Sequence, residues 1–92
     1  MDGADYHYKA YREGIQRASL IRKDLLAHPT EYFPEKVRTL NKTYILTVKE
    51  IIRQGELFLD KTNKLALGLK VATAIENYRA FLSTLPNRDE IK

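Results

Sequence analysis

Apolar residues recur at helical spacing over residues 37–59, the longest stretch of this kind in the chain. One side of such a helix would carry Val37, Leu40, Tyr44, Val48, Ile51 and Ile52. On the opposite side, four cations would lie within roughly 60° of one another, because successive residues of a helix are rotated by about 100°. These cations, called the cationic face below, are Arg38, Lys42, Lys49 and Arg53.

We expect no acid to interrupt the cationic face between Glu35 and Glu56. Neighbouring like charges on a helix repel one another by tenths of a kcal/mol, so an unneutralised row of cations favours contact with an anionic surface. A purely solvated face is the alternative, since charged residues usually occupy the outer side of an amphipathic helix.

A second periodic stretch predicts a helix over residues 4–27, which we expect Asp2 or Asp5 to cap. Its apolar positions are Tyr8, Tyr11, Ile15, Ala18, Ile21 and Leu25. We expect Tyr8 and Tyr11 in the core, with Tyr6 at its rim. Gly14 is interpreted as a tolerated surface glycine, and close approach by another helix or a ligand is the alternative.

The pair His28-Pro29 should end this helix, because a residue before proline is disfavoured in the α conformation. Tyr32 and Phe33 should fold back onto the bundle, and Pro34 suits the first turn of the next helix. We expect this helix to stop at Gln54, with Gly55 as its left-handed cap.

Asp60 or Thr62 should cap a third helix, carrying Leu65, Leu67, Val71, Ala74, Ile75, Tyr78, Leu82 and Leu85. The sequence therefore predicts an all-α fold, a three-helix up-down-up bundle with helices over about 4–27, 34–54 and 60–85. The same three-four spacing also continues through residues 44–69, so helices two and three could form one kinked helix. A polar tail should begin at about residue 86.

The bulk properties indicate one ordinary globular domain of 92 residues with a formal charge of +4. Cysteine is absent, which excludes disulfides and thiolate sites and fits a reducing intracellular compartment. No apolar run is long enough to span a bilayer, and the acidic N-terminus does not resemble a cleavable leader. His7 and His28 have no metal-ligand spacing, and no nucleophile, phosphate loop or carboxylate pair is evident, so we expect no enzyme, metal or cofactor.

The segment Ala10-Tyr11-Arg12, followed by Ile15 and Arg17, resembles the Leu-Tyr-Arg opening of LYR-motif proteins. A second block, residues 51–57 with Leu59, Leu65, Leu67 and Lys70, is similar to their last helix. The chain departs from the pattern at Ala10, which replaces leucine, and at Asn41-Lys42, which lacks the family's phenylalanine.

This resemblance implies an adaptor of the mitochondrial matrix that binds acidic acyl carrier protein and takes its acyl chain between the helices. Tyr11 and Arg12 would carry the motif, with Arg38 and Lys42 as partner contacts. Lys49 and Arg53 extend this predicted protein-binding surface through the cationic face.

Residues 8–15 also resemble the second helix of MIT domains, which bind helical peptides, and residues 49–57 resemble the helix after it. That alignment leaves no first helix in this chain. A small structural subunit of a larger complex is another alternative, which would expose apolar surface on several faces. Nucleic-acid binding is a lesser alternative that the four cations suggest and no motif supports.

Overall fold

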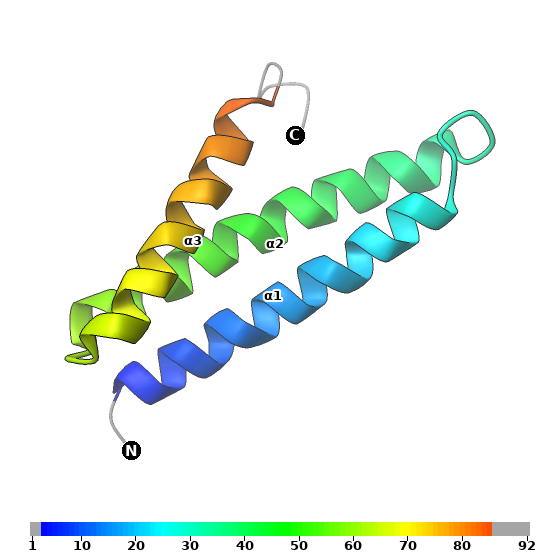
Figure 1. The fold of residues 1–92 in the computed structure, drawn as a ribbon. Coiled ribbons are helices and arrows are strands. Elements are labelled where there is room, and N and C mark those ends of the chain that lie inside the picture. The colour runs from blue at the N-terminus through cyan, green and yellow to red at the C-terminus, as the bar shows by residue number, and fades with distance from the viewer. Residues whose placement is uncertain (1–2, 86–92) are drawn as a thin grey trace.

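Three helices make up the computed structural model, which describes residues 3–85. They are α1 (Gly3–Ala27), α2 (Pro34–Lys61) and α3 (Leu65–Ser83). Helices α1 and α2 run antiparallel and lie close together, whereas α3 crosses α2 obliquely and ends apart from the α1–α2 loop (Figure 1). The predicted all-α three-helix fold is confirmed, and helices two and three are separate. Residues Asp2 and 86–92, including the predicted tail, lie outside the described part.

The first connection follows the sequence prediction closely. Helix α1 ends at Ala27, directly before His28-Pro29, and Pro34 occupies the first turn of α2. Proline is tolerated there because its missing N–H would have no partner within the helix. Asp5 lies within the first turn of α1.

The aromatic residues of this connection do not both fold back onto the bundle. Phe33 packs edge-on against the His28 ring, with 4.9 Å between ring centroids. Tyr32, in contrast, remains 73% exposed. The expectation for Tyr32 is wrong, because the turn formed by residues 29–33 directs it away from the helices.

Helix α2 continues through Gly55, so the predicted stop at Gln54 is wrong. No described glycine has a positive φ, and a left-handed cap requires one. A Cβ atom on Gly55 would lie 2.7 Å from Ile75 Cδ1 and 3.2 Å from Tyr11 Cδ1. Glycine is present here because the three helices approach one another closely.

The break between α2 and α3 lies at residues 62–64. Thr62 has extended backbone (φ −83°, ψ 147°), and its hydroxyl accepts a hydrogen bond from the Lys64 N–H at 3.1 Å. Asp60 lies inside α2 and Lys64 is the N-cap of α3, so the predicted start at Asp60 and its capping residues are wrong.

Gly14 marks a second close approach, between α1 and α2. It is buried, and a Cβ atom there would lie 2.8 Å from Ile51 Cγ1. The interpretation as a surface glycine is therefore wrong, and the alternative of close helix packing is confirmed.

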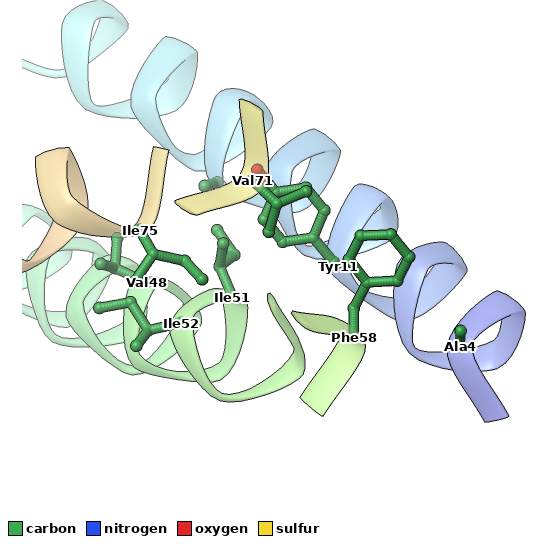
Figure 2. Packing of buried hydrophobic residues seen from close by; sticks show 9 residues of the cluster. Ala4, Tyr11, Val48, Ile51, Ile52, Phe58, Val71 and Ile75 are labelled. Carbon is green, nitrogen blue, oxygen red and sulfur yellow. The ribbon is translucent and has the colours of Figure 1, made fainter. Parts of the chain in front are cut away.

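The core lies where the three helices meet (Figure 2). Its buried members are Ala4, Tyr11, Ala18, Val48, Ile51, Ile52, Phe58, Val71 and Ile75. The predicted core placement of Tyr8 and Tyr11 is confirmed, and most of the predicted apolar positions of α1 and α2 either belong to this cluster or, like Ile15 and Tyr44, pack against it. The exceptions are Val37, which is buried outside the cluster, and Ile21, Leu25 and Leu40, which are half-buried. Leu65 is 87% exposed, so its predicted place in the core is wrong.

Candidate protein-binding surface

The cationic face forms on α2 as predicted, and all four of its residues are exposed. Arg38 and Arg53 are separated by about 22 Å along the helix, at a rise of 1.5 Å per residue. The described contacts that α1 makes with α2 include Ile51, Gln54, Gly55 and Phe58. That side of α2 is rotated by roughly 160° from the cationic face.

Helix α3 also leaves the cationic face uncovered. Its described contacts with α2 at Tyr44, Gly55 and Leu59 lie on a side rotated by roughly 120° from the four cations. Its contact at Glu56, in contrast, lies on the same side of α2 as the cations, beyond the end of their row. Glu56 ends the row of cations as expected, and it forms an ion pair with Arg79 of α3.

Arg38 forms a loose ion pair with Glu35, at 3.7 Å between Nη1 and Oε1. Both side chains are largely exposed, at 77% and 85%. Exposed pairs of this kind contribute about 0–1 kcal/mol, so Arg38 can exchange Glu35 for another carboxylate.

Arg53 is held much more firmly, by a fork of two hydrogen bonds to the Glu50 carboxylate at 2.9 and 2.8 Å. The same carboxylate accepts a hydrogen bond from Gln54 Nε2 at 2.9 Å. The hydrogen bonds from Arg53 and Gln54 lower the pKa of Glu50. The expectation that no acid interrupts the cationic face is therefore wrong at Arg53.

The Glu50 carboxylate belongs to a polar chain that reaches α1. Gln54 is buried, and its Oε1 lies 2.8 Å from Nδ1 of His7. Sequence reasoning missed this chain, although Glu50 precedes Arg53 by three residues and Gln54 by four, a spacing at which helical side chains meet. Arg53 is thus a structural member of the face.

Lys42 and Lys49 take part in none of the ion pairs described for residues 3–85. Both are exposed. These lysines, together with the loosely paired Arg38, are the members of the cationic face that remain available to a partner.

Tyr11 and Arg12 lie apart from this surface, on α1. Tyr11 is only 5% exposed, and its pKa is raised by burial and then by the neighbouring Tyr78 and Tyr8 hydroxyls. Arg12 donates to the Tyr8 hydroxyl at 3.1 Å and lies 5.8 Å from the centre of that ring. The structure brings the four α2 cations together and does not bring the two motif residues to them.

A groove of about 700 Å³ adjoins the first half of the cationic face. The described residues that line it are Thr30, Pro34, Val37, Arg38, Thr39, Asn41, Lys42, Thr43, Ile45 and Leu46. Sequence reasoning missed Ile45, which lies beside the predicted apolar stripe of α2, and the exposed Leu46, which lies next to the cations. Their apolar character directly after Tyr44 was the available signal.

No model of a protein family matches this sequence, and no curated protein or solved structure matches it either. The resemblances to LYR-motif proteins and MIT domains therefore stay predictions. Within residues 3–85, no helix is both long and apolar enough to cross a membrane. The same residues contain no group of three or more His, Cys, Asp or Glu that could hold a metal ion.

Proposed function

We propose that this protein is a non-enzymatic adaptor that binds an acidic helical partner through the cationic face of α2. The observation that carries the proposal is the position of this face: four exposed cations lie on the side of α2 away from the described contacts of α1 and α3, except for the ion pair of Glu56 with Arg79 beyond the end of the row. A surface left uncovered by its own bundle is available to a second protein.

The charges on this face suit recognition of a carboxylate-rich helix. Arg38 and Lys42 are one turn apart, and Lys49 follows two turns later, so acids spaced along a facing helix would meet them in register. Exposed charges of this kind mainly raise the association rate and select against basic partners. Affinity must then come from apolar contacts, which the neighbouring groove offers.

Acyl carrier protein is the leading candidate, because the resemblance to LYR-motif proteins implies it and it is acidic. A mitochondrial location rests on the same resemblance. An acyl chain at Gly14 or Gly55 would have to displace the tightly packed Ile51 or Ile75. We therefore propose binding to the protein surface and not uptake of the chain at these two positions.

The test is titration calorimetry with purified acyl carrier protein. Arg38→Glu/Lys42→Glu should weaken binding at least tenfold, since it replaces two attractive charges by two repulsive ones. Lys23→Glu/Lys70→Glu is the matched control: it changes the net charge equally, at exposed residues of α1 and α3. Equal affinity of the two double variants would refute the proposal, provided circular dichroism shows unchanged helicity.

A structural subunit of a larger assembly is the second candidate, favoured by exposed leucines on all three helices. These are Leu20, Leu26, Leu46, Leu65 and Leu69. Leu65 and Leu69 lie one turn apart on α3 and are 87% and 70% exposed, so they form one adjoining pair. This candidate predicts that Leu65→Ser/Leu69→Ser abolishes co-purification of native partners, whereas Arg38→Glu/Lys42→Glu leaves it intact.

An MIT-like module is the less favoured reading of the same bundle. It would bind a peptide between two helices. The described residues of the groove belong instead to α2 and to the loop before it.

A further inference from the structure

The corner between α2 and α3, residues 61–70, carries apolar side chains that the three helices leave uncovered. Leu65 and Leu69 are 87% and 70% exposed, and they lie on the same side of α3, rotated by only about 40° from one another. Ala66 beside them is also exposed. Single exposed leucines are common on protein surfaces, whereas adjoining ones that polar residues surround are typical of a contact site.

The cations next to these leucines have no partner of their own among the described ion pairs. Three exposed lysines adjoin the pair, one at the end of α2, one directly before Leu65 and one directly after Leu69: Lys61, Lys64 and Lys70. None of them takes part in the ion pairs described for residues 3–85. Asp60 is the one acid within residues 57–75. The α2–α3 corner therefore has a net positive charge.

The start of α3 adds to this positive charge. Its N-cap is Lys64, which makes no side-chain capping hydrogen bond, and its first turn contains no acidic residue. The helix dipole places partial positive charge at an N-terminus, where acids are stabilising and a lysine is unfavourable. An anionic surface next to the corner would offset both the dipole and the lysines.

The apolar surface of the corner is short and lies at an end of the molecule. The turn between α2 and α3 lies at the opposite end of the α1–α2 pair from the α1–α2 loop (Figure 1). Glu76, on the same side of α3 as the leucines, ends their apolar surface about 10 Å beyond Leu69. Stable protein interfaces bury about 800 Å² on each partner, which two leucines do not supply. A fluid bilayer needs no such area.

We propose that the α2–α3 corner docks on an anionic lipid bilayer. Leu65 and Leu69 enter the boundary between head groups and acyl chains, and the three lysines contact the anionic head groups. The two leucines are about 6 Å apart along α3, which matches the depth of about 5–10 Å that peripheral apolar faces reach. This inference does not rest on the proposed adaptor function, because no residue of the cationic face belongs to the corner.

The test uses tryptophan fluorescence, because the chain contains no tryptophan. Leu65→Trp places one reporter at the corner, where the side chain is exposed. Its emission should shift to shorter wavelength with vesicles of phosphatidylserine and phosphatidylcholine, and phosphatidylcholine alone should bind at least tenfold more weakly. The matched control is Leu46→Trp, which lies among the cations of α2 and should not shift.

Paired leucine variants test the insertion by co-sedimentation with the same vesicles. Leu65→Gln/Leu69→Gln should weaken binding at least tenfold, because two leucines no longer leave water. Glutamine has nearly the helix propensity of leucine. Leu20→Gln/Leu26→Gln, at exposed leucines of α1, removes the same side chains elsewhere and should leave binding unchanged.

Paired lysine variants test the head-group contacts in the same assay. Lys64→Gln/Lys70→Gln should weaken binding by about fivefold for each lysine, the effect of one cation close to an anionic bilayer. Lys23→Gln/Lys36→Gln lowers the net charge equally, at exposed residues of α1 and α2 near the α1–α2 loop. It should bind like the unchanged protein.

Four results would overturn the proposal. One is an unshifted Leu65→Trp emission, and a second is equal binding to neutral and anionic vesicles. A third is unchanged binding by either corner variant. The fourth is a shift of Leu65→Trp that depends on protein concentration without vesicles, which would identify a second copy of the chain as the occupant.

Discussion

Gly14 and Gly55 determine how closely the three helices approach one another. At both positions a Cβ atom would lie under 3.0 Å from a side chain of the opposing helix, Ile51 or Ile75. Gly68 differs, because the nearest atom to a Cβ there is Leu59 Cδ2 at 3.5 Å, an ordinary contact. The helix propensity of alanine is the same at all three sites, so packing decides the outcome.

Gly14→Ala should therefore destabilise the protein. Overpacking a filled core costs about 1–3 kcal/mol, which exceeds the roughly 1 kcal/mol that alanine gains over glycine in a helix. Urea unfolding measures the difference. Gly68→Ala is the control and should be neutral or stabilising by about 0.5–1 kcal/mol; a stabilising Gly14→Ala would contradict the close packing of α1 on α2.

The buried tyrosines Tyr11 and Tyr78 should make the protein less stable as the pH rises through the alkaline range. Burial raises the pKa of each above the ordinary tyrosine value of 10.0. Between pH 10.0 and the raised pKa, the folded protein keeps the two phenol protons, whereas the unfolded chain loses them. The contribution of the two protonated tyrosines to the free energy of unfolding is therefore complete below pH 10.0 and is lost as the pH rises through the raised pKa.

The measurement is the urea midpoint at roughly pH 9 and roughly pH 11, either side of the tyrosine pKa. The midpoint should fall at the higher pH, and it should fall less in Tyr11→Phe/Tyr78→Phe. The exposed Tyr32→Phe serves as control. An equal fall in all three proteins would show that the two buried tyrosines are not responsible.

At the scale of single residues, the sequence predicted which side chains are buried better than it predicted which of them form ion pairs and hydrogen bonds. The core positions of α1 and α2 followed from apolar spacing, because burial of a helix face depends mainly on that spacing. The Glu50–Arg53 fork and the buried Gln54 were missed, although their spacing was visible. Which of several i, i+3 and i, i+4 pairs forms depends on side-chain geometry that the spacing alone does not fix.

At the scale of helices, the main error was the end of α2. Glycine after an apolar run commonly marks a helix end, but the apolar spacing continues beyond Gly55 to the buried Phe58. The close contact with Ile75 of α3 explains why position 55 is a glycine. The residues that neighbour Gly55 in the sequence do not indicate that contact. The break at residues 62–64 is marked only by Thr62 and Asn63, which favour helices weakly.

Hydrogen exchange tests the continuity of α2. The amides of residues 52–58 should exchange as slowly as those of residues 45–51, since both segments lie within one helix that packs on the core. NMR after transfer to D₂O gives the rates. Fast exchange confined to the amides next to Gly55 would indicate two helices with a joint at this glycine.

At the scale of the whole molecule, the oblique crossing of α3 is what leaves α2 available. Periodicity predicts which residues of a helix are buried, but it does not give the angle between helices, which depends on the side chains at the contact. The four cations were predicted to share one side and do so. That all four stay exposed with α1 and α3 in place, and that a groove adjoins them, became visible only in three dimensions.

The position of the partner on the surface tests the central claim most directly. Amide shifts of the ¹⁵N-labelled chain, recorded during titration with unlabelled acyl carrier protein, report which residues it contacts. We predict that the largest shifts fall on Arg38, Lys42, Lys49 and their neighbours on the outer side of α2. Shifts confined to α1 or to the exposed leucines of α3, or no shifts at all, would contradict the proposed binding surface.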